Sequence, residues 1–218
     1  MYSTIKTDSA QRITEIRENL DFFTPLIPLP PTATPRHLNT SKGLIFVQLY
    51  GVIEFTIGST IAKTIDLINN DLVNIQDLKT LLWGLALDSK LDSLNQANRK
   101  KWDKRIELFQ SIVDNSPALI NNITMPTNGQ NFNLPQLKSL WNNFNISEPI
   151  FNDIGFRGRL QEIVSNRINI AHGNNSASEV GSRVTPNDLY DRLNEVSNFC
   201  SYFISVFEDY TINKKYKN

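Results

Sequence analysis

The amino-acid sequence predicts an all-α protein, built as a bundle of helices. Apolar residues recur three or four positions apart in at least five segments, which is the spacing of one face of an α-helix. Strand patterns are few, and 218 residues with 40% hydrophobic and 20% charged residues suffice for a folded core. Helices that bury apolar stripes against one another, without a sheet, form a bundle.

The first 37 residues are expected to form a helix and a connector that precede the main domain. Apolar residues from Ile13 to Phe23 share one face of a helix over residues 7–23. Five of the ten prolines follow between residues 25 and 35, where they oppose helix and favour extended chain. Residues 38–218 are then expected to form the main helical domain.

The segment from Ser41 to Asn69 is apolar on nearly every side, as in a central buried helix. Its β-branched residues also allow a hairpin turning at Gly51, and periodicity alone leaves this alternative open. The remaining elements follow from three-four spacing and from turn residues. Helices are expected at residues 75–87, 101–113, 134–144, 156–171 and 186–210, the last capped by Thr185, with polar loops at 121–133 and 173–184.

Composition and motifs exclude several classes of protein. Lys plus Arg and Asp plus Glu both number 22, which argues against broad, non-specific coating of nucleic acid. The lone Cys200, among aromatic residues, is expected to be a buried structural thiol, and His37 a surface residue. No glycine-rich phosphate loop or paired-histidine motif is present, so neither a cofactor nor a metal is predicted.

The most apolar stretch is interrupted by Gln48 and Glu54, and it falls short of an uninterrupted membrane span. The N-terminus lacks the apolar core of a signal peptide. The sequence therefore predicts a cytoplasmic protein without a membrane partner.

The residues that point to chemistry are Arg167 and His172, near the end of the helix at residues 156–171. Gly173 is a helix stop signal, so His172 belongs to the last turn, where the helix dipole favours the imidazolium. Histidine is the usual proton carrier in acid–base catalysis, and a guanidinium binds the non-bridging oxygens of a phosphate. Together they suit RNA cleavage, in which the ribose 2′-hydroxyl attacks its own phosphodiester.

The helical periodicity places Arg167 and His172 on the two flanks of the buried stripe, about 140° apart. They can meet only if the helix end unwinds or another surface completes the pocket, and a two-fold dimer of the chain would do so. Arg157 and Arg159 give this helix a local excess of positive charge and are candidate substrate-binding residues. The same spacing also arises by chance, and a histidine in a last turn can simply stabilise its helix.

At these residues the sequence resembles the HEPN superfamily, whose signature is an arginine, four to six residues and a histidine near a helix end. The Ala171-His172-Gly173 ending resembles a bacterial branch, the RiboL-PSP-like HEPN proteins of defence and toxin loci. Residues 43–65, with Tyr50 and Glu54, resemble the first core helix of that branch, which favours helix over hairpin there. Residues 132–146 and 185–210 resemble the helices that flank the motif.

The resemblance implies an HEPN-type helical bundle that forms a homodimer and cleaves RNA without a metal. Arg167 would bind the phosphate and His172 would act as the acid–base residue, in a toxin or an anti-phage defence system. Such a system implies a cognate antitoxin or another defence partner protein.

Two features bear on this assignment. Many family members have a polar residue, often asparagine, directly after the arginine, whereas Ile168 stands there in this chain. Asn166 or Asn169 is a candidate substitute. Glu54 is a candidate partner that orients Arg167, with an exposed helix edge as the equal alternative. The competing functions are a catalytically inactive HEPN-type binding or regulatory subunit and a helical scaffold with no role in nucleic-acid chemistry.

Overall fold

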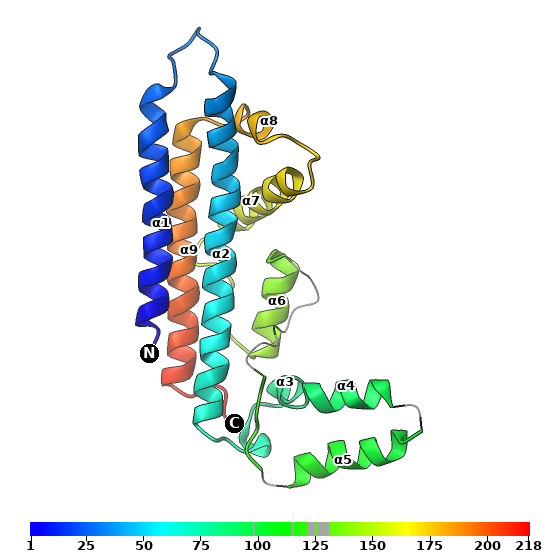
Figure 1. Cartoon of the computed structure of the whole chain (residues 1–218). Helices are drawn as coiled ribbons and strands as arrows, with labels where there is room; N and C mark the ends of the chain where they lie inside the picture. Colours follow the sequence, from blue (N-terminus) through cyan, green and yellow to red (C-terminus); the bar gives the residue numbers. More distant parts are fainter. Residues whose placement is uncertain (98, 115, 122–124, 126–130) are drawn as a thin grey trace. The chain divides into compact units, whose positions relative to one another are not determined.

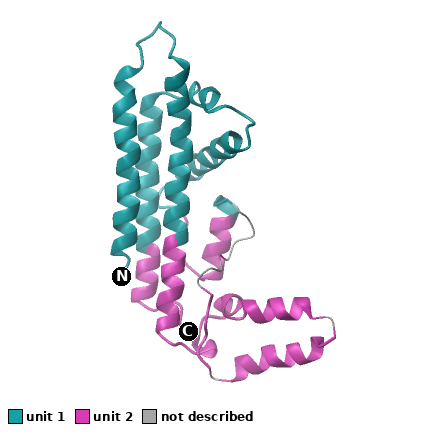
Figure 2. Cartoon of the chain, in the orientation of Figure 1, with its two compact units in different colours: residues 1–58, 129–135, 151–205 teal, residues 59–128, 136–150, 206–218 magenta. Residues whose placement is uncertain are grey.

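The computed structural model describes residues 1–218 except 98, 115, 122–124 and 126–130. Within the described part of the chain, every regular element longer than a single β-bridge is a helix, which confirms the all-α prediction (Figure 1). The chain divides into two compact units, coloured separately in Figure 2. Unit 1 comprises Met1–Gly58, Gly129–Pro135 and Phe151–Ser205, and unit 2 comprises Ser59–Asn128, Gln136–Ile150 and Val206–Asn218. The predicted domain boundary after residue 37 stays a prediction.

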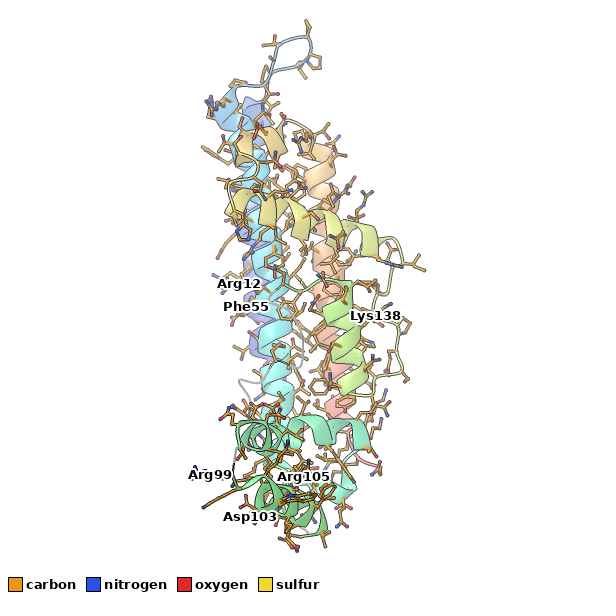
Figure 3. All side chains as sticks on the ribbon, turned by 90° about the vertical axis from the view of Figure 1, so that its right-hand side faces the viewer. Arg12, Phe55, Arg99, Asp103, Arg105 and Lys138 are labelled. Atoms are coloured by element: carbon orange, nitrogen blue, oxygen red, sulfur yellow. The ribbon has the colours of Figure 1, made fainter. Side chains whose placement is uncertain are left out.

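Three long helices lie side by side (Figure 1): α1 (Ser3–Phe23), α2 (Arg36–Asn70) and α9 (Pro186–Ile212). Helix α1 belongs to unit 1, as do α2 up to Gly58 and α9 up to Ser205. The residues that predicted α1 are the ones it buries, since Ile13, Ile16, Leu20 and Phe23 are all in the core. Polar contacts add to this packing, and the guanidinium of Arg12 lies 4.1 Å from the Phe55 ring centroid (Figure 3). The side-chain hydrogen bonds between these helices include Ser9–Thr56, Arg17–Asn194 and Tyr190–Asp21.

Helix α2 is continuous through Gly51, so the hairpin alternative is wrong. It begins at Arg36 and not at Ser41, where the predicted segment starts, because the Pro35 carbonyl already accepts hydrogen bonds from the backbone N–H groups of residues 38 and 39. The Ser41 hydroxyl instead donates to the His37 carbonyl inside the helix.

By length and composition α2 is apolar enough to cross a membrane, and 56% of its most apolar window is buried inside the protein. The core helix of a bundle passes the same test, so this is weak evidence for a span.

Helix α7 (Phe156–Ala171) has the predicted bounds and packs on α9 within unit 1. The Phe156 ring stacks on Phe199 with centroids 4.8 Å apart. The N-terminus of α9 is capped as predicted, because Thr185 and Asp188 exchange side-chain to backbone hydrogen bonds. These contacts hold α7 by its apolar stripe and leave its last turn at the edge of the unit.

The predicted polar loop at residues 173–184 contains a short helix, α8 (Ala177–Gly181), so this part of the loop prediction is wrong. A capping box formed by Ser176 and Glu179 starts the helix. The helix packs very closely on α2, since a Cβ added at Gly43 would collide with the Ala177 carbonyl. Only glycine permits this approach.

Unit 2 contains α3 (Trp83–Ala86), α4 (Asp88–Gln96) and α5 (Lys101–Val113), together with two 3₁₀ turns at Ile75–Asp77 and Thr80–Leu82. The single helix predicted for residues 75–87 is therefore wrong, because Leu78 and Lys79 between the turns have extended ψ angles of 146° and 135°. Helix α4 was not predicted, whereas α5 has its predicted bounds.

Helix α6 (Leu134–Asn143) confirms the helix predicted before the motif. Most of the polar loop predicted at residues 121–133 lies outside the described residues.

The core of unit 2 is largely aromatic. The Phe144 ring meets Phe207 and Tyr210 edge-on, with centroids 5.4 and 5.9 Å apart. Near the C-terminus Asp71 binds Lys214 and Lys217 at 2.6 Å each. These ammonium groups, Lys214 first, hold the pKa of the Asp71 carboxyl well below its usual range.

Candidate active site at the end of helix α7

The last turn of α7 presents His172 to solvent. Residue 172 caps the helix, and its backbone N–H donates to the Ile168 carbonyl at 2.9 Å. Gly173 then adopts a left-handed φ of +73°, which ends the helix as its sequence predicts. The His172 side chain is exposed, and its imidazole has no hydrogen-bond partner among the described residues. Its ring nitrogens are therefore accessible to a substrate.

Arg167 is half-buried one and a half turns earlier, and two residues of unit 1 hold its guanidinium. Its Cζ lies 4.7 Å from the centroid of the Tyr50 ring, as in a cation–π contact. Its Nη1 donates to Oδ1 of Asn131 at 3.2 Å. No carboxylate within the described part of the chain forms an ion pair with it, so its positive charge is not neutralised.

Tyr50 contacts Arg167, Asn131 and Glu54 from the buried face of α2, where only 1% of its surface is exposed. Its hydroxyl accepts a hydrogen bond from the Phe132 backbone N–H at 3.2 Å. The same hydroxyl lies 3.5 Å from Glu54 Oε1 and 3.4 Å from Asn131 Oδ1, and can donate to one of them at a time. Burial, aided by the negative charge of Glu54, raises the pKa of Tyr50, so the hydroxyl stays protonated at neutral pH.

Glu54 does not form the direct ion pair with Arg167 that the sequence suggested. Both residues are described, and the structure has no ion pair between them. Glu54 is exposed, so the desolvation cost that called for a partner does not arise. Glu54 is linked to Arg167 through Tyr50, whose hydroxyl lies beside the carboxylate and whose ring meets the guanidinium.

The four other candidate residues are two asparagines and two arginines, and none of their side chains forms a hydrogen bond with Arg167 or His172 in the described part of the chain. Asn166 and Asn169 are half-buried, and neither side chain bonds to Arg167 or His172 in the structure. Arg157 is exposed and has no ion pair among the described residues. Arg159 is exposed too, but it lies 3.7 Å from Glu162 and 3.6 Å from Glu195, so its charge is largely compensated.

Two residues of the site were not expected from the sequence. Asn131 lies within the polar loop predicted at residues 121–133, and nothing in its neighbours indicates a role. Tyr50 lies in the segment predicted as a buried helix and is in the core, and its spacing of four residues from Glu54 already placed both on one side of α2.

Because α7 is regular to Ala171, the predicted angle of about 140° between Arg167 and His172 holds, and the two residues are about 7.5 Å apart along the helix. One copy of the helix therefore offers a guanidinium without an ion pair among the described residues and an accessible imidazole, on the two flanks of its buried stripe. In the described part of the chain, no three His, Cys, Asp or Glu side chains cluster to hold a metal ion.

The lone cysteine, Cys200, and the second histidine, His37, lie as the sequence predicted. Cys200 is buried, and burial raises the pKa of its thiol to about 11, which opposes a role as nucleophile. His37 is exposed.

An arginine and a histidine at this spacing, near the end of a late helix in an all-α bundle, match the signature of the HEPN class of proteins. The model of the HEPN_MAE_28990-like HEPN family matches residues 1–216, and the chain belongs to that family. The predicted HEPN membership is thus confirmed, and the match includes α1 and the proline-rich connector. No curated protein and no solved structure matches the chain significantly.

Proposed function

We propose that this protein is a metal-independent endoribonuclease of a bacterial toxin or anti-phage defence system, with Arg167 and His172 as its catalytic residues. The observation that carries the proposal is the state of Arg167. Its guanidinium is held in place by an aromatic ring and an amide, while no carboxylate compensates its charge. Such a group is pre-organised for an anion, and an exposed imidazole follows on the same helix.

In the proposed reaction a neutral His172 takes the proton of the ribose 2′-hydroxyl, and the O2′–P bond forms. The P–O5′ bond breaks, and an imidazolium gives its proton to the leaving 5′-oxygen. Arg167 binds the non-bridging oxygens as negative charge builds on them. The products are a 2′,3′-cyclic phosphate and a 5′-hydroxyl, and the two proton transfers require two imidazoles or one that works twice.

A homodimer that supplies the second imidazole is part of the proposal. Leu44 and Val47 on α2 are 43% and 36% exposed, and Gly51 is exposed as well. With Glu54 these positions fall within an arc of about 80° on α2, directly beside Tyr50. An apolar strip next to the candidate site supports a partner copy there.

The test is cleavage of tRNA or total cellular RNA by the purified protein in EDTA. We expect 2′,3′-cyclic phosphate ends, and loss of cleavage in both His172→Ala and Arg167→Ala. The matched controls are His37→Ala and Arg183→Ala, which remove an exposed histidine and an exposed arginine elsewhere and should cleave normally. Cleavage that survives in His172→Ala would overturn the assignment.

A catalytically inactive HEPN subunit, which binds or regulates a partner of the same system, is the second candidate. It is favoured by Ile168, which places an aliphatic side chain where many HEPN proteins have a polar one. Absence of cleavage together with absence of growth arrest on expression would support it. Either function places the protein in the cytoplasm, with a cognate antitoxin or another defence protein as its partner.

A further inference from the structure

Helix α5 in unit 2 has an exposed apolar stripe, here named the α5 seam: Trp102, Ile106, Phe109 and Val113. These side chains are 73%, 65%, 64% and 66% exposed. Their spacing of four, three and four residues is that of a helix that packs along another helix. Single exposed apolar residues are ordinary, but four consecutive stripe positions left in solvent mark an interaction surface.

The seam borders a shallow groove formed with α4, which lies beside α5 in Figure 1. The groove has a volume of 660 Å³, and Leu94 of α4 and Leu108 of α5 contribute to it together with the seam. The Arg105 guanidinium covers one face of Trp102, 4.5 Å from the ring centroid. The surface is therefore apolar along its length and has one cationic edge.

Charge along α5 is strongly polarised. Residues 99–105 carry five basic side chains and one acidic one, and Figure 3 labels Arg99, Asp103 and Arg105 of this group. Residues 106–114 carry Glu107 and Asp114 and no basic side chain. The negative end of the helix dipole adds to the acidic character of the second half. A complementary surface is therefore acidic opposite the first half and basic opposite the second.

We propose that the α5 seam binds the α5 seam of a second copy of this chain, with the two helices antiparallel. In this arrangement Trp102 faces Val113 of the second copy, and Ile106 faces its Phe109, so the seam is complementary to itself. Each basic first half meets the acidic second half of the other copy. A parallel arrangement would instead bring the two basic clusters together, at a cost of like-charge repulsion.

The area supports a weak association. A fully exposed aromatic side chain presents roughly 150–250 Å². At the observed exposures the four seam residues present on the order of 500 Å² per copy, so two copies bury about 1,000 Å², near the lower limit for specific interfaces. The association should therefore depend on concentration.

This contact is separate from the homodimer proposed at the end of α7. The experiment is sedimentation velocity of the full chain across a range of concentrations, with Phe109→Glu as the seam variant. Ile154→Glu is the matched control, since it places the same charge at a 90% exposed apolar position of unit 1. We expect Phe109→Glu to weaken association through the α5 seam at least tenfold, and the control to leave that association unchanged. Val47→Glu should weaken the homodimer at the end of α7 and leave association through the α5 seam unchanged.

Tryptophan fluorescence provides a second measurement on the same samples. Trp141 is buried and Trp83 half-buried, so Trp102 dominates quenching by iodide. Quenching should fall as the concentration of the wild-type chain rises, and should stay high in Phe109→Glu. Asp114→Lys should also weaken the step, because it places a lysine opposite the basic cluster of the second copy.

An unchanged sedimentation profile in Phe109→Glu would overturn the proposal. An unchanged profile with weaker binding of a single-stranded RNA oligonucleotide would assign the seam to nucleic acid instead. The proposal would also be contradicted if Phe109→Glu lost the association while iodide quenching of Trp102 in the wild type did not change with concentration. None of these outcomes depends on RNA cleavage, so the seam and the proposed nuclease can fail independently.

Discussion

Two arginines on helix α7, eight residues apart, have opposite kinds of partners. Arg159 lies within ion-pair distance of two carboxylates, Glu162 and Glu195. Arg167 is held by the Tyr50 ring and the Asn131 amide oxygen, neither of which carries a charge. The first arrangement neutralises a charge, whereas the second orients a charge and leaves it available.

The difference indicates a structural role for Arg159 and supports the catalytic role proposed for Arg167. Glu162 and Glu195 also bind Arg192, at 2.8 and 3.4 Å, and this residue of α9 is only 8% exposed. The four charges together join α7 to α9. A phosphate that approaches Arg159 would meet two carboxylates, whereas one that approaches Arg167 would meet a guanidinium already oriented by its neighbours. The predictions that follow test this contrast.

The largest effect is expected from Arg167→Ala on RNA cleavage. Removing one pre-organised donor to a developing negative charge costs a factor of about 100 or more, which is about 2.7 kcal/mol of transition-state stabilisation. Arg159→Ala should change the rate by less than about threefold, because its charge is already compensated. Rates measured at saturating RNA compare the two variants, and equal losses would remove the distinction between them.

Arg192→Ala should have the largest effect on stability. It leaves two glutamates, each about 30% exposed, without their buried partner. Breaking a fully buried ion pair costs about 3–5 kcal/mol, and the exposure of the glutamates reduces our expectation to about 2 kcal/mol. Arg159→Ala should cost less than about 1 kcal/mol. Urea denaturation measures both, and a smaller loss in Arg192→Ala than in Arg159→Ala would contradict the structural role of Arg192.

Much of the fold could be predicted because its helices are amphipathic and carry local start and stop signals. The bounds of α5 and α7, and the Thr185 cap of α9, follow from spacing and from single residues. The segment at residues 75–87 misled because its apolar residues have helical spacing while Leu78 lies in extended backbone, where it pairs with Lys217 near the C-terminus. A pairing between residues so distant in sequence leaves no local pattern. Helix α8 was missed although Ser176 and Glu179 form a recognisable capping box.

The candidate site divides in the same way. Arg167 and His172 are on one helix, so their spacing and their resemblance to HEPN proteins predicted them. Tyr50 and Asn131 reach Arg167 from positions 117 and 36 residues away in sequence, and only the fold brings these groups together. The expected pairing of Glu54 with Arg167 assumed that Glu54 is buried, because α2 is apolar on nearly every side. Glu54 is exposed, so it does not need a charged partner.

Asn131→Asp would convert the arrangement at Arg167 into that at Arg159. The substitution keeps the shape of the side chain and places a carboxylate where Oδ1 accepts from Nη1 at 3.2 Å. We expect about tenfold slower cleavage, or about 1.4 kcal/mol, because the carboxylate competes with the phosphate. Asn194→Asp makes the same change beside Arg17, which donates to Asn194 at 2.8 Å, and should leave the rate unchanged. Equal rates in both variants would show that the uncompensated charge of Arg167 is unimportant.

The smallest effect on cleavage is expected from Tyr50→Phe, which separates the ring that supports Arg167 from the hydroxyl. The ring remains, so cleavage should fall by less than about threefold, whereas the Phe132 N–H loses its acceptor at a cost of about 1 kcal/mol of stability. Because burial raises the pKa of Tyr50, its stabilisation is present below the unfolded-state value of about 10 and is lost as the pH rises through the folded-state value. The stability of Tyr50→Phe should therefore fall less steeply than that of the wild type above pH 10. A loss of cleavage as large as that of Arg167→Ala would instead mean that the hydroxyl, and not the ring, positions the guanidinium.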